Sequence, residues 1–319
     1  MCTYNGDMHI ESQLRSIAEQ STLPSELIIC DDKSSDNTKS ILRNFKKNAP
    51  FKVKLTDNTD NLGPVRNFAQ AIQKCQYDTI FLCDQDDIWA PEKIEATTTS
   101  FQENPLALYA FSDATMIDNN GQPTGRSLWK GFKLPNFKSD FRKEKQLQVL
   151  LQQNVVTGAA MAIKASLKQA ALPIPVFSMH DYWLAILGST ISFGVTIPAP
   201  LIKYRIHPKQ ACGWGKKGFF KSLEISLKSN ERDSRKRLSD FKNLQQRLAH
   251  IAQFTDIPKK KSELIDKKTT HLTKRCDIRT SNALSKPVKV ISETLSGRYH
   301  NFSDSNRTAW ESIARDLCL

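Results

Sequence analysis

The run from Ile80 to Trp89 constrains this chain more than any other stretch. An apolar strand pattern ends there in three carboxylates within four residues, at Asp84, Asp86 and Asp87. A buried strand cannot keep that much negative charge without a partner. Open α/β sheets place their ligand crevice at the carboxyl ends of strands, and oxygen-rich clusters suit Mg²⁺ or Mn²⁺ shared with substrate phosphates. A solvated acidic turn is the alternative, and the run alone does not exclude it.

Strand-like and helix-like segments alternate over the first 200 residues. Short apolar or alternating runs predict strands at 26–30, 51–56, 79–83, 106–111, 115–117, 159–163 and 193–197. Apolar residues at helical spacing predict helices at 7–20, 36–47, 65–75, 91–103, 146–151 and 180–188. This alternation predicts an α/β fold with a mainly parallel, doubly wound sheet.

The first six residues pose a problem for that sheet. They are typical of the end of a strand turning into a helix, but a central parallel strand needs about five residues. We therefore expect the first strand to be missing or truncated, and the native chain to begin before Met1.

Charge divides the chain near His207. Residues 1–207 carry a net charge of +1 and residues 208–319 carry +12, out of +13 for the whole chain. We therefore predict a first domain at 1–207 and a basic, mostly helical C-terminal region at 208–319. Within that region, 213–221 mixes aromatic and basic residues and suits an anionic membrane surface, although a solvated helical face explains it equally. The polar stretch 125–145 is a candidate lid or acceptor loop.

Other features of the composition indicate a cytoplasmic protein. The sequence has no apolar run of about 18 residues and no signal-peptide pattern at its start. Seven dispersed cysteines without a CxxC pair indicate reduced thiols and argue against a zinc site.

Seven local patterns follow one another in order along residues 1–207. They are Cys-Thr-Tyr-Asn-Gly at 2–6, Ile-Ile-Cys-Asp-Asp-Lys-Ser-Ser-Asp-Asn-Thr at 28–38, Asn-Leu-Gly-Pro-Val-Arg-Asn-Phe at 61–68, Phe-Leu-Cys-Asp-Gln-Asp-Asp-Ile-Trp at 81–89, Thr-Gly-Ala-Ala-Met at 157–161, His-Asp-Tyr-Trp at 180–183 and Tyr-Arg-Ile-His at 204–207. Together they resemble the family 2 glycosyltransferases, in particular the bacterial rhamnosyltransferase-like branch. The resemblance implies a GT-A fold, a nucleotide-sugar donor and inversion at the anomeric carbon.

The resemblance also implies a donor nucleotide site. Its residues would be Thr3, Tyr4, Asp31, Asp32, Arg66, Asn67 and Asp84. Asp31 or Asp32 would accept hydrogen bonds from the base or the ribose, and Arg66 would approach the diphosphate at a helix start. In the alternative, Asp31 caps the helix that begins near Asp36, and Arg66 pairs with a neighbouring carboxylate.

A divalent metal, Mg²⁺ or Mn²⁺, is implied at the Asp-x-Asp. Asp86 is the first candidate ligand and Asp84 the second, with Asp87 behind them and His207 as a further ligand. Such an ion would neutralise charge on the leaving diphosphate. His207 could instead be a structural histidine, and Trp89 is expected to pack rather than to contact the sugar.

Asp181 occupies the position of the catalytic base. The implied pocket for the donor sugar and the acceptor comprises Asn154, Thr157, Gly158, His180 and Arg205. His180 stands where the family often has Glu, which leaves its role open. In the alternatives, Asp181 caps the helix after it and Gly158 only permits close packing.

The function expected from these residues is that of an inverting glycosyltransferase in bacterial surface polysaccharide synthesis, such as that of O-antigen. The donor would be a dTDP- or UDP-sugar, with rhamnose as the branch-level candidate, and the acceptor a glycan or a lipid-linked glycan. The protein would be cytoplasmic and peripheral on the inner face of the plasma membrane. The alternatives are a truncated or non-catalytic relative and a basic nucleic-acid-binding protein. The carboxylate-rich first two-thirds argues against a nucleic-acid partner.

Overall fold

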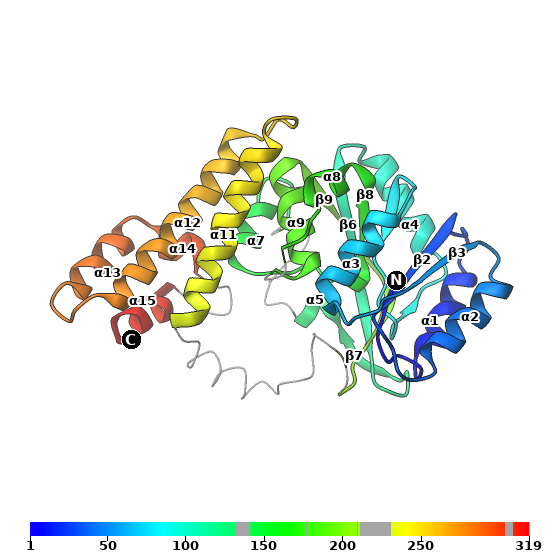
Figure 1. Cartoon of the computed structure of the whole chain (residues 1–319). Helices are drawn as coiled ribbons and strands as arrows, with labels where there is room; N and C mark the ends of the chain where they lie inside the picture. Colours follow the sequence, from blue (N-terminus) through cyan, green and yellow to red (C-terminus); the bar gives the residue numbers. More distant parts are fainter. Residues whose placement is uncertain (132–140, 176–177, 209, 211–230, 304–308, 319) are drawn as a thin grey trace. The chain divides into compact units, whose positions relative to one another are not determined.

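Figure 1 shows the computed structural model of the chain. The structure describes residues 1–131, 141–175, 178–208, 210, 231–303 and 309–318. The chain forms two compact units, one of residues 1–138 and 156–213 and one of residues 139–155 and 214–319. Residues 139–155 belong to the second unit although they precede the predicted boundary at His207, which stays a prediction.

The first unit begins with a small parallel sheet. Strands β1 (Cys2–Thr3), β2 (Glu26–Asp31) and β3 (Lys52–Asp57) lie in the order β1-β2-β3. Three helices alternate with them, α1 (Ile10–Ala18), α2 (Thr38–Asn48) and α3 (Gly63–Lys74). The first strand, expected to be missing or truncated, is present as a two-residue strand. The predicted strand and helix alternation is confirmed in this part of the chain.

The second sheet is mixed rather than mainly parallel. Its order is β4-β8-β6-β9-β5, formed by Thr79–Phe81, Met161–Lys164, Ala107–Ile117, Phe193–Arg205 and Ile88–Trp89, and β7 (Pro123–Ser127) pairs with β6. Among the strand pairs of this sheet in the described residues, β6 and β9 are parallel and the others are antiparallel. The expectation of a mainly parallel sheet was therefore wrong here, because alternation of apolar residues does not reveal strand direction. The strands expected at 106–111 and 115–117 are one strand, β6.

A backbone hydrogen bond joins the two sheets at the end of β4, where the N–H of Cys2 donates to the carbonyl oxygen of Cys83 at 3.2 Å. The N–H of Leu82 donates to the carbonyl of Met161 at 3.0 Å and continues the pairing of β4 with β8. The ends of β1, β2 and the segment after β4 therefore share one edge. In the described part of this unit the remaining helices are α4 (Lys93–Glu103), α5 (Leu128–Gly131), the 3₁₀ turn η1 (Gly158–Ala160), α8 (Ala165–Ala171) and α9 (His180–Ile191).

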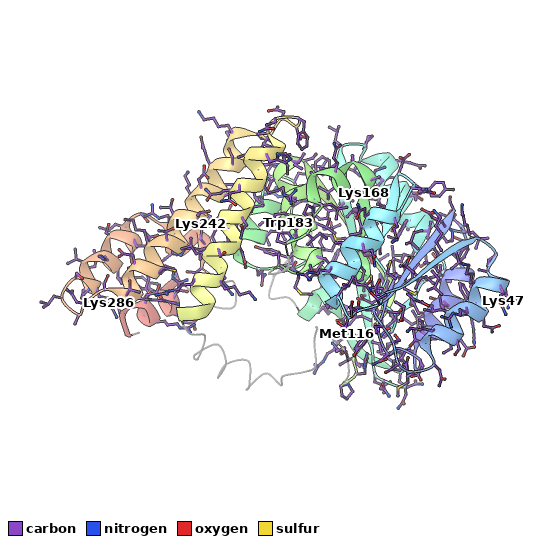
Figure 2. All side chains as sticks on the ribbon, in the orientation of Figure 1. Lys47, Met116, Lys168, Trp183, Lys242 and Lys286 are labelled. Carbon is purple, nitrogen blue, oxygen red and sulfur yellow. The ribbon has the colours of Figure 1, made fainter. Side chains whose placement is uncertain are left out.

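The interior around β6 and α9 is closely packed. Tyr109 of β6 is fully buried, and its hydroxyl bonds Ser189 at 2.7 Å. A Cβ atom added at Gly194 would lie 2.2 Å from the Tyr109 ring, so only glycine fits there. Trp183 of α9 is also buried, and its indole N–H donates to the carbonyl of Ala171 at 2.8 Å (Figure 2). Helix α9 is therefore held rigidly, including the residues at its start.

The second unit is helical throughout its described part, which confirms the predicted helical C-terminal region. Its helices are α7 (Gln146–Gln152), α11 (Glu231–Ile251), α12 (Lys259–Thr280), α13 (Lys286–Leu295), α14 (Arg298–Phe302) and α15 (Ala309–Cys318). Asp316 accepts hydrogen bonds from Arg275, Arg279 and Tyr299 and ties α12, α14 and α15 together. No helix within the described ranges is both long and apolar enough to span a bilayer. The segment 213–221 and residues 132–140 of the candidate lid lie outside the described residues.

Candidate active site

The predicted carboxylates gather in the loop between β4 and β5. Asp84 is partly exposed and receives no side-chain hydrogen bond from the described residues. Burial raises the pKa of Asp84 to about 7, and the charges of Asp86 and then Asp181 add to the shift. Asp181 lies almost a hundred positions after Asp84 in the sequence. The fold nevertheless brings the predicted base close enough to the predicted metal ligand for its charge to act on Asp84.

Asp86 is paired with His207. The ring Nε2 of His207 lies 2.8 Å from Asp86 Oδ2, and the His207 side chain is 9% exposed. A second histidine, His9, stands before α1 with its ring centroid 5.2 Å from that of His207. Burial lowers the pKa of His9, with the charge of Arg205 as the next cause. Sequence reasoning missed His9, because no spacing rule links the start of α1 to the end of β9.

Asp87 and Arg205 hold the acidic loop in place. The backbone N–H of Arg205 donates to Asp87 Oδ1 at 2.9 Å, while Asp87 Oδ2 has no partner among the described residues. The Arg205 guanidinium donates to the backbone carbonyls of Asp86 at 2.8 Å, Asp118 at 3.2 Å and Asn119 at 3.0 Å. Arg205 is only 5% exposed. In this structure its guanidinium therefore organises the loop.

Asp181 stands in the first turn of α9. Helix α9 begins at His180 with Met179 in the N-cap position, so Asp181 is not the capping residue. The Asp181 carboxylate accepts hydrogen bonds from the backbone N–H of Gly158 at 3.1 Å and of Tyr182 at 2.6 Å. These two bonds fix the orientation of the carboxylate.

His180 is packed behind Asp181. Its ring stacks on Phe68 with centroids 3.9 Å apart and planes 15° apart, and neither ring nitrogen has a partner among the described residues. Burial lowers the pKa of His180. A Cβ atom at Gly158 would lie 2.8 Å from His180 Nε2 and 3.5 Å from the Asp181 Cβ. Close packing at Gly158 is therefore what sets the distance between η1 and α9.

Lys93 is a buried cation that sequence reasoning missed. It is 1% exposed, and its Nζ donates to the carbonyl of Ala159 at 2.8 Å and lies 4.3 Å from the centroid of the Trp89 ring. Burial lowers the pKa of Lys93 to about 8, although Cys83, Asp87 and Asp84 act in the opposite direction. Lys93 thus links the acidic loop to the turn that holds Asp181. Trp89 packs in the interior, as expected.

Asp31 uses its carboxylate for hydrogen bonds to Thr3 and to the loop after β2. It is fully buried and accepts hydrogen bonds from the Thr3 hydroxyl at 2.8 Å and from the Ser34 N–H and hydroxyl at 2.8 and 2.6 Å. Lys39 lies 3.9 Å away. The structure thus gives Asp31 a loop-organising role, and its contact with a nucleotide stays a prediction.

Asp32 binds the start of α3. Its carboxylate accepts hydrogen bonds from the backbone N–H groups of Leu62 at 2.8 Å and Gly63 at 2.9 Å, and from the Asn58 side chain at 3.0 Å. Gly63 has a positive φ of 76°, a conformation that glycine adopts easily. Asp32 is 3% exposed, so it too shapes the loops around the predicted donor site.

The other predicted donor residues differ in exposure. Tyr4 is 51% exposed, and the Gln85 side chain bonds its N–H at 2.8 Å and its carbonyl at 3.0 Å. Arg66 is exposed in the first turns of α3 and has no ion pair within the described part of the chain. Asn67 is buried and donates to the carbonyl of Cys30 at 2.9 Å. Tyr4 and Arg66 are therefore accessible to a ligand, whereas Asn67 fastens α3 to β2.

Two further predicted residues belong to different units of the chain. Thr157 occupies the N-cap position of η1, next to Gly158, whose N–H donates to Asp181. Asn154 follows α7 and belongs to the second unit. The place of Asn154 in the pocket stays a prediction.

The predicted metal ligands at the Asp-x-Asp are carboxylates. No cluster of three or more His, Cys, Asp or Glu side chains in the described residues is arranged as a metal site. Asp84 and Asp86 carry the carboxylate oxygens that Mg²⁺ and Mn²⁺ prefer, and a metal bound to them stays a prediction. The raised pKa of Asp84 and the unpartnered Oδ2 of Asp87 are signs of negative charge without full compensation. A divalent ion would supply that compensation.

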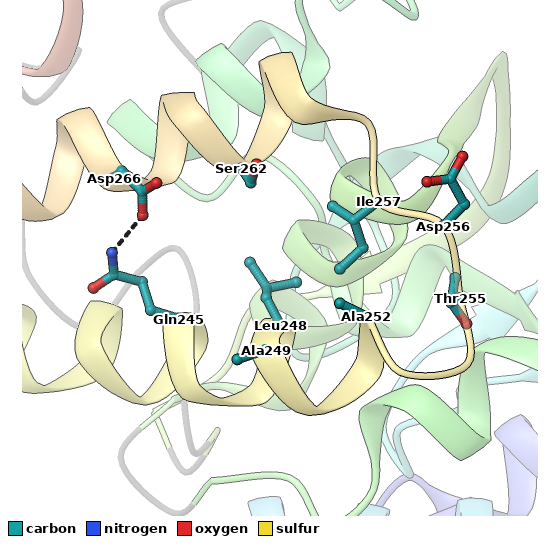
Figure 3. A pocket seen from close by; sticks show the side chains of 9 residues that line it. All are labelled: Gln245, Leu248, Ala249, Ala252, Thr255, Asp256, Ile257, Ser262 and Asp266. Carbon is teal, nitrogen blue, oxygen red and sulfur yellow. Dashed lines mark hydrogen bonds between the residues drawn. The ribbon is translucent and has the colours of Figure 1, made fainter.

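The helical unit contains a separate hollow of about 320 Å³ between the end of α11 and the start of α12 (Figure 3). It is lined by Gln245, Leu248, Ala249, Ala252, Thr255, Asp256, Ile257, Ser262 and Asp266. Gln245 and Asp266 are hydrogen-bonded to each other at 2.5 Å. None of the predicted site residues lies in this lining.

Comparisons with known proteins agree with the resemblance. The family model described as "Glycosyl transferase family 2" matches residues 1–169. The dTDP-rhamnosyl transferase RfbG of Shigella flexneri is 34% identical over 133 residues, which cover 40% of this chain and 43% of that protein. The beta-1,3-glucosyltransferase WfgD of Escherichia coli, named for UDP-Glc and an α-D-GlcNAc-diphosphoundecaprenol acceptor, is 28% identical over 38% of this chain and 46% of its own length. The matched region thus spans less than half of these relatives.

Two solved structures share the fold. TarS residues 1–349 of S. aureus, in complex with UDP-GlcNAc, superposes with a TM-score of 0.54 at 14% identity and covers 99% of this chain and 87% of that one. The mannosyltransferase PcManGT of Pyrobaculum calidifontis, in complex with GDP-Man and Mn²⁺, has a TM-score of 0.50 at 17% identity, covering 93% of this chain and 74% of that one. At these identities the likeness shows an α/β fold matching these glycosyltransferases, with a helical C-terminal region.

Proposed function

Because the chain belongs to glycosyl transferase family 2, we propose that it moves a sugar from a nucleotide-sugar donor to a glycan or lipid-linked glycan acceptor during bacterial surface polysaccharide synthesis. The observation that supports this proposal is that the charges of Asp86 and Asp181 both act on Asp84 and raise its pKa, although Asp181 comes from a different element of the fold. The proposed location is the cytoplasm, at the inner face of the plasma membrane.

In the proposed mechanism Asp181 is the general base. A single displacement with inversion needs a carboxylate near the acceptor hydroxyl, on the side opposite the leaving group. The N–H groups of Gly158 and Tyr182 hold the Asp181 carboxylate in one orientation, which favours attack along a fixed line. Asp181 accepts the proton of the acceptor hydroxyl as that oxygen bonds the anomeric carbon, while the bond from the anomeric carbon to the diphosphate breaks and the nucleoside diphosphate leaves with that electron pair.

The donor would bind beside the acidic loop. Asp84 and Asp86, with His207 on Asp86, would hold a divalent cation, which when bound neutralises charge on the diphosphate. The exposed guanidinium of Arg66 at the start of α3 is available to a phosphate oxygen. The exposed Tyr4 would face the nucleotide, with Thr3, Asp31 and Asp32 shaping the loops that receive it.

We propose dTDP-rhamnose or a UDP-sugar as the donor. Support comes from the relatives, one named as a dTDP-rhamnosyl transferase and one as a UDP-Glc-dependent enzyme that acts on a diphosphoundecaprenol-linked sugar. The GDP-Man and Mn²⁺ complex of the mannosyltransferase neighbour supports a metal-assisted donor site.

The test is a thermal-shift titration with dTDP, UDP and GDP, each with and without Mn²⁺, on this chain and on one extended upstream of Met1. A ligand at a hundred times its dissociation constant raises the free energy of unfolding by about 2.7 kcal/mol. We expect a metal-dependent shift for one nucleotide. If a well-folded protein responds to none of them, the donor site is wrongly assigned.

A further inference from the structure

Helix α13 carries an exposed apolar stripe on the second unit. Leu284, just before the helix, is 90% exposed, and Val288, Ile291 and Leu295 are 68%, 58% and 83% exposed. Their spacings of four, three and four residues place them along one face of α13. The opposite face packs inward through Val290 and Glu293. A single exposed apolar side chain is ordinary, but four aligned ones mark a contact surface.

The exposed charges within residues 282–300 are of one sign, and a half-exposed acid of α12, Asp277, lies beside them. Between residues 282 and 300 the only carboxylate is Glu293, which is 2% exposed and paired with His271 and Arg298. Lys286 and Lys289 lie on α13 itself, and Lys289 pairs with Asp277 at 2.9 Å (Figure 2 labels Lys286). The surface of α13 therefore combines apolar side chains with lysines and no exposed acid.

A second copy of this chain is a poor occupant for the stripe. Residues 208–319 carry a net charge of +12 in each copy, which opposes self-association. Stable dimers bury about 800 Å² on each partner, more than four side chains can supply. An anionic lipid surface, in contrast, attracts the charge and accepts the apolar side chains at its boundary.

We propose that the α13 stripe docks this protein onto a membrane surface rich in anionic lipid. The apolar side chains enter the interfacial region while Lys286 remains at the headgroups. The proposed membrane-facing element is then α13. This inference does not rest on the donor site, and it can be tested in the absence of a nucleotide sugar.

The experiment is co-sedimentation of the full chain with phosphatidylcholine vesicles and with vesicles of an equal phosphatidylcholine–phosphatidylglycerol mixture. We expect binding to the anionic vesicles only. Val288→Ser combined with Ile291→Ser and Leu295→Ser should weaken that binding by at least about tenfold. Lys286→Gln should weaken vesicle binding by about fivefold, and this difference from wild type should become smaller at high salt.

Matched controls keep the outcome interpretable. Leu106→Ser removes a side chain that is 75% exposed in the first unit and should leave vesicle binding unchanged. Leu284→Ser alone lies outside the helix, so it tests the stripe without disturbing the α13 fold. Equal binding of wild type and both stripe variants overturns the proposal. So does a wild type that dimerises through the stripe in sedimentation equilibrium and ignores both kinds of vesicle.

Discussion

Replacing Asp84 with Asn should remove a pH-dependent loss of stability. Burial together with the charges of Asp86 and Asp181 raises the pKa of Asp84 from 3.8 to about 7 in the folded protein. Between these two values the folded protein keeps a proton that the unfolded chain releases. The free energy of unfolding of the metal-free wild type therefore falls as the pH rises from about 4 to about 7.

The size of this effect follows from the pKa difference. Roughly three pKa units correspond to an upper limit of about 4 kcal/mol at pH 8. Asp84 is partly exposed, and water screens part of that penalty, so we expect about 1–2 kcal/mol. An Asn at this position has no proton to release, so the part of the pH dependence that comes from Asp84 should disappear, while the part from Asp87, whose pKa burial also raises, remains.

Urea unfolding in the presence of a chelator, at pH 5 and at pH 8, measures the difference. Asp60→Asn is the control, because the Asp60 side chain is 79% exposed and its change should leave the pH profile as it is. Added Mn²⁺ should restore stability to the wild type at pH 8 and do little for Asp84→Asn. If the free energy of unfolding of wild type and of Asp84→Asn changed with pH in the same way, the inference that Asp84 carries uncompensated negative charge would be refuted.

Three further changes test the surroundings of the base. Asp181→Asn should abolish sugar transfer while nucleotide binding in the thermal-shift assay persists, and undiminished turnover would remove Asp181 from its role. Lys93→Met should change the free energy of unfolding by less than about 2 kcal/mol, because it removes a buried charge but leaves the Ala159 carbonyl without its donor. The rate of sugar transfer should fall. Full activity in steady-state kinetics would show that the contact of Lys93 with the turn beside Asp181 does not matter for transfer. Gly158→Ala should lower the free energy of unfolding, measured with urea, by about 1–3 kcal/mol because the new methyl group overpacks against His180, and it should lower kcat. A variant with normal stability would show that η1 can move to accept the methyl group.

The order of elements in the first half could be predicted because each one is local. Apolar spacing located α1, α2 and α3, and the runs at 26–30 and 51–56 located β2 and β3 to within a residue or two. The direction of strands in the second sheet could not be read in this way. β9 runs parallel to β6 and antiparallel to β5, and both pairings depend on partners far apart in sequence.

The acidic loop was predicted from sequence, but the groups that surround it were not. Carboxylates in series after an apolar run are visible without a structure. A lysine at the start of a helix, such as Lys93, looks like an ordinary exposed residue until packing places it beneath Trp89. Asp31 and Asp32 show the converse: side chains predicted to contact a ligand also satisfy backbone N–H groups of neighbouring loops.

These contacts suggest why so many polar residues in this half of the chain are buried. Asp32 holds the start of α3, Arg205 holds the acidic loop, and Lys93 holds η1, each through hydrogen bonds to backbone atoms. Backbone atoms cannot change with a substitution elsewhere, so such bonds fix loop positions independently of the neighbouring side chains. Among the charged residues predicted for the site, Asp84 and Arg66 form no side-chain hydrogen bond or ion pair within the described part of the chain, and one is negative and the other positive. Buried polar groups thus build the loops while these two charges stay accessible, as the proposed binding of a cation and a phosphate requires.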